Sequence, residues 1–168
     1  MNRLIAILLF ALSLPVAAHE QDSHSLFTGT WRGTLVNEPA RPNAARIDVV
    51  REIGPMPAAD HTCTMWKTTY SEGGVVKQVK DYTLCRGTGP NDLSIDEGGG
   101  VRLPARWIGD VLVTPFKVGQ ILLVVHTRLR GNVLDEEILT VDDQPATTGI
   151  VPLTPRTIQR LTFTRAAS

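Results

Sequence analysis

The 168-residue sequence has little of several features that usually point to a function. Lys and Arg number 17 against 17 Asp and Glu, so the formal net charge is zero. This balance argues against nucleic acid or an anionic membrane surface as the main partner, because both attract a basic excess. Glycine-rich phosphate loops, Gly-x-Ser-x-Gly and His-Glu-x-x-His are absent, which removes the commonest signatures of nucleotide-binding and hydrolytic sites.

Long apolar runs are also scarce, and the one present lies at the N-terminus. Arg3 precedes an apolar stretch from Leu4 to Leu12, and small residues lead up to Ala18. This order is typical of a secretory signal peptide, so we expect residues 1–18 to be removed and the protein to be exported to the periplasm or beyond the cell. The stretch is too short to span a membrane, and we expect no stable membrane insertion.

The rest of the chain lacks the period of an amphipathic helix and is rich in β-branched residues and turn formers. Apolar and polar residues alternate repeatedly instead, which indicates strands. We expect a flexible segment over 19–25 and a single domain over 26–166. Strands are expected near 27–36, 45–53, 62–70, 75–85, 93–96, 101–108, 110–116, 120–130, 133–141 and 156–165. So many short strands predict an all-β, antiparallel up-and-down barrel of about 8–10 strands, because closure removes exposed edges.

The only two cysteines, Cys63 and Cys85, set the register of one predicted hairpin. An exported chain meets an oxidising compartment, so a disulfide between them is the default. If the two lie directly opposite each other, the turn centres on Gly74, within a sequence suited to a turn. The same register places Lys67 opposite Asp81 on the disulfide face.

The other face of this hairpin is the candidate ligand surface. Trp66 then lies opposite Tyr82, with Tyr70 and Leu84 on the same face. A small barrel with inward aromatic side chains can hold an apolar ligand. The alternative is that these side chains simply fill the core, as most inward aromatics do.

A second hairpin spans residues 120–141 and turns at Gly131-Asn132, which suits a two-residue turn. This turn opposes apolar pairs on one face and, on the other, places Arg128 opposite Asp135. Far from the turn both faces are apolar, so we expect a covering loop or a homodimer that uses this hairpin as a docking edge. Glu136 lies on the apolar face, and being near the turn it is expected to reach water at the barrel rim.

The two ends of the domain carry a resemblance to a known family. Gly29-Thr30-Trp31 resembles the Gly-x-Trp of the first strand of lipocalins and related calycin barrels, and residues 158–165 are similar to their last strand. The resemblance implies that Trp31 forms the floor of a cup for a small apolar molecule. It also implies that Arg160 or Arg165 covers this Trp in a cation–π contact. Ten strands fit the fatty-acid-binding or nitrobindin-like branch as well.

Few residues suggest catalysis or metal binding. Glu136, His126 and His61 are the candidate acid–base groups, and His126 faces Glu137 in the predicted register. An N-terminal His19 left by signal cleavage can bind copper through its amine and ring, with His24 as a further ligand. We expect no resident cofactor or metal. The favoured function is binding of a small, mainly apolar ligand; a small enzyme acting at the barrel mouth and an interaction module of the cell envelope remain open.

Overall fold

The computed structural model describes residues 23–143 and 153–167 as a closed barrel of ten antiparallel strands. Each strand pairs with its neighbours in sequence and β1 pairs with β10, so the predicted up-and-down barrel is confirmed. The strands are β1 (Gly29–Glu38), β2 (Ile47–Ile53), β3 (Cys63–Glu72), β4 (Val75–Arg86), β5 (Asp92–Gly98), β6 (Val101–Ile108), β7 (Val111–Val118), β8 (Ile121–Arg130), β9 (Val133–Asp143) and β10 (Leu153–Arg165). In the described ranges, no helix has the length and apolar character needed to cross a bilayer.

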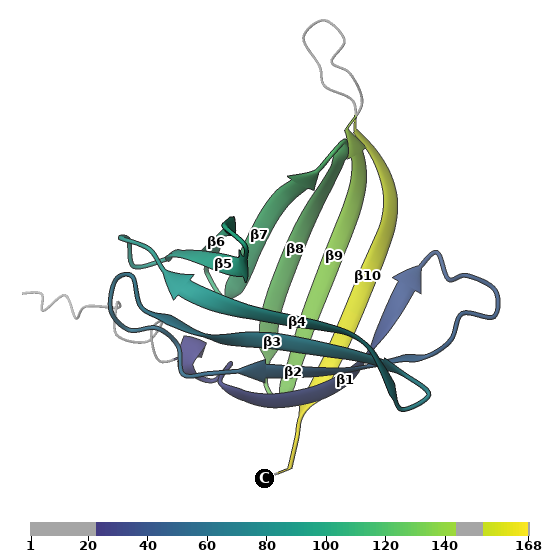
Figure 1. Cartoon of the computed structure of the whole chain (residues 1–168), viewed down its shortest axis with the longest axis horizontal. Coiled ribbons are helices and arrows are strands. Elements are labelled where there is room, and N and C mark those ends of the chain that lie inside the picture. Colours follow the sequence, from purple (N-terminus) through teal and green to yellow (C-terminus); the bar gives the residue numbers. More distant parts are fainter. Residues whose placement is uncertain (1–22, 144–152, 168) are drawn as a thin grey trace, which may run out of the picture.

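The barrel wall consists of two groups of long strands joined by a short hairpin. Strands β1–β4 cross the view while β8–β10 rise steeply behind them (Figure 1). The β5–β6 hairpin bridges the groups through short ladders, pairing with β4 only over Thr83–Arg86 and with β7 only over Arg106–Ile108. These two seams hold the wall together with fewer pairs than the long ladders elsewhere.

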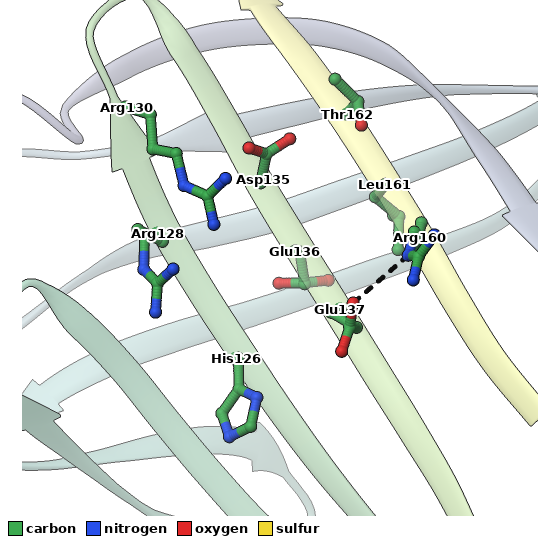
Figure 2. Close-up of a pocket in the computed structure, with 9 residues that line it drawn as sticks. All are labelled: His126, Arg128, Arg130, Asp135, Glu136, Glu137, Arg160, Leu161 and Thr162. Atoms are coloured by element: carbon green, nitrogen blue, oxygen red, sulfur yellow. Dashed lines mark hydrogen bonds and ion pairs between the residues drawn. The ribbon is translucent and has the colours of Figure 1, made fainter.

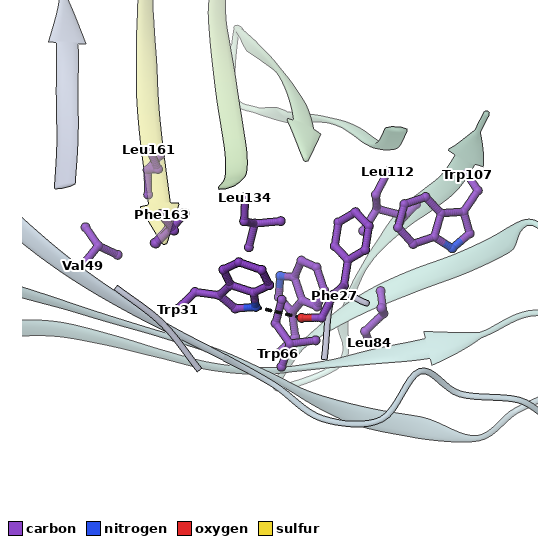
Figure 3. Close-up of a cluster of buried hydrophobic side chains, with 12 residues drawn as sticks. Phe27, Trp31, Val49, Trp66, Leu84, Trp107, Leu112, Leu134, Leu161 and Phe163 are labelled. Atoms are coloured by element: carbon purple, nitrogen blue, oxygen red, sulfur yellow. Dashed lines mark hydrogen bonds between the residues drawn. The ribbon is translucent and has the colours of Figure 1, made fainter. Parts of the chain in front are cut away.

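One end of the interior is filled by apolar side chains. Trp31, Leu134 and Phe163 are fully buried there, and the Trp31 indole Nε1–H donates to the Phe27 carbonyl at 2.8 Å. Figure 3 shows this cluster, in which side chains from strands far apart in sequence meet. Gly33 lets β1 approach β10 closely, since a Cβ there would lie 2.0 Å from the Thr162 carbonyl oxygen.

Arg165 lies over the indole ring of Trp31 in this packed end. Its guanidinium carbon is 4.2 Å from the centre of the Trp31 ring, and its Nη1 donates to the Thr28 carbonyl at 2.6 Å. Arg160, the other arginine suggested by the resemblance, instead lies on the outer face and pairs with Glu38 at 3.1 Å. The two positions are an odd number of residues apart on β10, so their side chains point to opposite faces.

The first hairpin, β3–β4, keeps the expected register over most of its length. Cys63 and Cys85 form the disulfide and lie opposite each other, and the register holds as far as Tyr70. A β-bulge between Tyr70 and Ser71 then shifts the last pairs by one, so that the turn is Gly73-Gly74 rather than centred on Gly74. A bulge is not visible in the alternation that set the register.

The expected ion pair of this hairpin forms elsewhere. Lys67 lies opposite Asp81, yet its ammonium is 3.4 Å from Glu52 on the other neighbouring strand, β2. A long lysine side chain reaches the strand on either side equally well. Directly opposed charges are therefore an incomplete guide to ion pairs on this surface.

The second hairpin, β8–β9, has the predicted register throughout. Its charges again pair with other strands, because Arg128 lies 3.6 Å from Asp110 and Glu137 lies 3.2 Å from Arg160. Its backbone edges are not free, because β8 pairs with β7 and β9 pairs with β10. Docking through this hairpin stays a prediction. A homodimer through this hairpin would have to use its outer face.

Candidate functional site

A buried ion pair crosses the barrel interior. Arg51 of β2 donates from Nη1 and Nη2 to the two carboxylate oxygens of Glu136 on β9, at 2.7 and 2.9 Å. The two side chains are 3% and 6% exposed. Two threonines complete the network, since Thr68 accepts from Arg51 Nε at 2.7 Å and Thr127 donates to Glu136 at 2.9 Å. The expectation that Glu136 reaches water at the rim is therefore wrong.

The electrostatics keep this pair ionised. Burial by itself disfavours both charged forms, but the Glu136 charge and hydrogen bonds outweigh it and raise the pKa of Arg51 above its usual value. Burial likewise works to raise the pKa of Glu136, yet the Arg51 charge, its hydrogen bonds and that of Thr127 hold this pKa below the ordinary range. A carboxylate held in this way is a poor proton acceptor at neutral pH, which argues against Glu136 as a general base.

The ion pair marks the boundary between two parts of the interior. The guanidinium of Arg51 lies 5.4 Å from the ring centres of both Trp66 and Phe163. Both rings belong to the buried apolar cluster, and Trp66 also borders a cavity. Aromatic faces stabilise a desolvated guanidinium, so the packing itself supports this buried charge.

The cavity beyond the ion pair has a volume of about 120 Å³. Its lining comes from nine strands, β2 to β10: Arg51, Trp66, Thr68, Tyr70, Lys80, Tyr82, Ile95, Glu97, Leu103, Thr114, Phe116, Leu123, Val125, Thr127, Glu136, Ile138 and Gln159. Three of the four residues proposed from sequence, Trp66, Tyr70 and Tyr82, contribute to this lining. Leu84 shares their face but lies in the packed core, fully buried (Figure 3).

Both tyrosines of the chain border this cavity. Burial, reinforced by the negative charge of Glu136, raises the pKa of Tyr70 to about 12. Burial and the neighbouring Glu97 also raise the pKa of Tyr82. Both phenols are therefore protonated at neutral pH and can donate hydrogen bonds into the cavity.

The cavity is amphipathic and carries no net charge. Arg51 and Lys80 balance Glu97 and Glu136, while the remaining walls are largely aliphatic or aromatic. Lys80 lies with its ammonium 5.7 Å from the centre of the Tyr70 ring. The buried ion pair thus places two opposite charges beside these largely apolar walls.

A larger hollow of about 400 Å³ lies on the outer face of β8–β10 (Figure 2). His126, Arg128 and Arg160 border it, together with the carboxylates of Asp135 and Glu137. Charges of both signs border it, and Arg160 pairs with Glu137 across two of its strands. Such a surface is typical of a solvated sheet face, and we assign it no site.

The sequence-based acid–base candidates are not brought together. His126 is exposed on the outer face, whereas Glu136 faces the interior from the paired strand. Glu137, opposite His126, pairs instead with Arg160. His61 is exposed in the loop before β3, in a left-handed conformation with φ of 61°.

Of the two metal candidates, the structure describes one. His19 lies outside the described residues. His24, in a helical turn before β1, stacks on Trp107 with ring centroids 3.8 Å apart. Over residues 23–143 and 153–167, no group of three or more histidine, cysteine or acidic side chains is placed to hold a metal ion.

Sequence reasoning missed Arg51, the partner of Glu136. In β2 it follows Ile47 and Val49 at the period of a strand, so it occupies an inward position among apolar residues. Glu136 stands between Leu134 and Ile138 in the same way. Two opposite charges on inward faces of one small barrel are a signal that could have suggested the pair.

The comparisons with family models and with curated proteins give no match for this chain. The closed ten-strand antiparallel barrel is consistent with a calycin-like fold. Arguments about function therefore rest on the geometry of the barrel and its cavity.

Proposed function

We propose that the protein binds a small, mainly apolar molecule in the cavity between Trp66, the two tyrosines and the Arg51–Glu136 pair. The observation that carries this proposal is the contrast within one barrel: apolar side chains fill one end, while the other keeps a cavity with aromatic and aliphatic walls. Binding pockets typically combine such walls with a few fixed polar groups.

The cavity size limits the ligand. Its volume of about 120 Å³ is close to the roughly 150 Å³ of an engineered apolar cavity that binds benzene. Pockets for drug-sized molecules measure about 300–1,000 Å³. The buried part of the ligand is therefore about one ring in size, and any longer substituent would extend past the side chains at the mouth.

The ligand would be held chiefly by burial of its apolar surface. Transfer from water contributes roughly 25 cal/mol per Å² of apolar area removed from solvent. The Cys63–Cys85 disulfide fits an exported protein in an oxidising compartment. Together these features support an extracytoplasmic carrier or sensor of small molecules.

Two neighbouring valines give a matched test. Val125 lines the cavity, whereas Val124 points to the outer face of the same strand. Titration with toluene, followed by tryptophan fluorescence, should saturate for the wild type and for Val124→Phe. Val125→Phe, which fills the cavity, should abolish the response while its far-UV spectrum stays native. Equal responses from the two variants, or no saturable response from the wild type, would overturn the proposal.

A further inference from the structure

We call the part of the cavity beside the Arg51–Glu136 pair its floor. Hydroxyl groups there carry hydrogen atoms that form no hydrogen bond within the described part of the barrel. Thr68 accepts the Nε–H of Arg51, and among the described residues its hydroxyl donates to no partner. Tyr70 borders the same cavity, and in the described ranges its hydroxyl donates to no other group of the protein. A protonated phenol carries one O–H donor, so this hydrogen is available to a ligand.

The carboxylate oxygens of Glu136 at the floor, in contrast, already accept hydrogen bonds. One oxygen of Glu136 accepts from Arg51, and the other accepts from both Arg51 and Thr127. The floor therefore presents a surplus of donors to the cavity. A buried donor without a partner costs about 1–3 kcal/mol, so a ligand that supplies an acceptor gains over one that does not.

The same network disfavours a charged ligand. The guanidinium of Arg51 already holds Glu136 in a bidentate contact, with both side chains nearly fully buried. A ligand carboxylate would lose its hydration beside a buried carboxylate, and a ligand cation would do so beside a buried guanidinium. The other two charges of the lining, Lys80 and Glu97, are opposite in sign and partly exposed, so neither offers a desolvated counterion at the floor.

We infer that the cavity selects uncharged molecules of about one ring that carry a hydrogen-bond acceptor, such as a carbonyl oxygen. The hydroxyls of Thr68 and Tyr70 donate hydrogen bonds to this acceptor. This inference rests on the proposed function and names the ligand class for that cavity. Arg51 positions the Thr68 hydroxyl, and Glu136 neutralises Arg51.

Three probes of closely similar size separate the contributions: acetophenone carries an acceptor, isopropylbenzene does not, and benzoate is charged. Dissociation constants are measured for the wild type, Tyr70→Phe, Thr68→Val and Thr68→Ser. Tyr70→Phe and Thr68→Val should each weaken acetophenone about fivefold and leave isopropylbenzene unchanged. Thr68→Ser, which keeps the hydroxyl, should retain wild-type affinity for both neutral probes.

Thr114→Val is the matched control, since this buried threonine lines the cavity but, among the described residues, forms no hydrogen bond with the ion pair. It should not change the ratio of the acetophenone and isopropylbenzene affinities. Benzoate should bind at least about tenfold more weakly than acetophenone.

The outcomes separate the two proposals. Saturable binding of isopropylbenzene supports the cavity as a ligand site whatever the hydroxyl variants do. If Tyr70→Phe shifts both neutral probes alike, or if benzoate binds most tightly, the inference about ligand class is overturned. If no probe binds, the proposed function and this inference fall together. Should Thr68→Val not fold, Tyr70→Phe, which removes only a hydroxyl, decides the question.

Discussion

The two ends of the barrel interior are filled by different kinds of side chain. At one end large apolar side chains such as Trp31 and Phe163 interdigitate with no exposure. At the other end, a salt-bridged arginine and glutamate occupy inward positions and leave a cavity beside them. Strand β9 passes through both, with Leu134 packed and Glu136 ion-paired two residues later. The alternation along a strand therefore shows which face a residue occupies, but not whether its side chain is close-packed or borders a cavity.

A buried ion pair is not in itself evidence of added stability. Replacing a buried ion pair with well-packed apolar residues is often neutral or stabilising, whereas removing one partner is costly. Arg51 and Glu136 border the cavity as a fixed polar pair, which is the role that the proposed function gives them.

Glu136→Leu should cause the largest loss of stability. It leaves the Arg51 charge buried without a partner, at an expected cost of about 3–5 kcal/mol in the free energy of unfolding measured with urea. The double variant Arg51→Met/Glu136→Leu should recover most of that loss. A single-variant cost below about 1 kcal/mol would show that the charge finds water or another partner.

A pair of leucine truncations compares the two ends directly. Leu134 is fully buried in the packed end, while Leu123 is half-buried beside the cavity. Leu134→Ala should destabilise the protein by about 2–5 kcal/mol, since it opens a void among close-packed neighbours. Leu123→Ala should cost clearly less in the same urea measurement. Equal costs would mean that the cavity half is as tightly packed as the other.

Acid should weaken the cavity end through Glu136. Its pKa is lowered in the folded state, so the unfolded chain binds the proton more readily and stability falls as pH drops below the ordinary value of 4.5 and through the folded value. Urea unfolding at a series of pH values should show a shallower decline over this range for Arg51→Met/Glu136→Leu than for the wild type. The same slope for both would contradict the assignment.

Alkali should report on the cavity through its two tyrosines. The raised pKa of Tyr70, about 12, keeps its phenol protonated after the unfolded chain begins to ionise near 10, so stability falls as pH rises between these values. Absorbance of phenolate should show both tyrosines ionising late, and Tyr70→Phe should remove the later step. A normal titration of both would indicate an open, solvated cavity.

The smallest effect belongs to the lid of the packed end. Arg165→Ala removes the contact over Trp31 and the hydrogen bonds to Thr28 and Leu26. Because Arg165 is exposed, the expected cost is about 0.5–1 kcal/mol. Arg160→Ala, on the outer face of the same strand, should change the thermal midpoint less. The reverse order would make the surface ion pairs the stronger contribution.

Much of the fold could be predicted because its signals are local. The cysteines and the turn at Gly131 set two hairpin registers, and strand alternation set the inward faces. Depth within the barrel could not be predicted: Trp66 and Leu84 share a face, yet only Trp66 borders the cavity. The tilt of the strands and the closure of the barrel determine how deep a side chain lies along the barrel axis. Neither can be inferred from the sequence of a single hairpin.

The environment of Glu136 could not be predicted for a related reason. Its partner, Arg51, lies 85 residues away in the sequence and is brought near only when the barrel closes. Judged from its own hairpin, a glutamate near a turn is expected to reach solvent. Closure of the barrel brings Arg51 to Glu136 as its counterion, and the sequence of the hairpin contains no signal of that contact.

The central claim is that small ligands enter the cavity half and leave the packed half unchanged. A titration of the labelled protein with acetophenone, followed by amide and methyl chemical shifts, tests it most directly. We predict saturable shifts at Thr68, Tyr70 and Val125, and none at Trp31 or Leu161. The absence of saturable shifts, or shifts centred on the packed end or the outer face, would contradict the account.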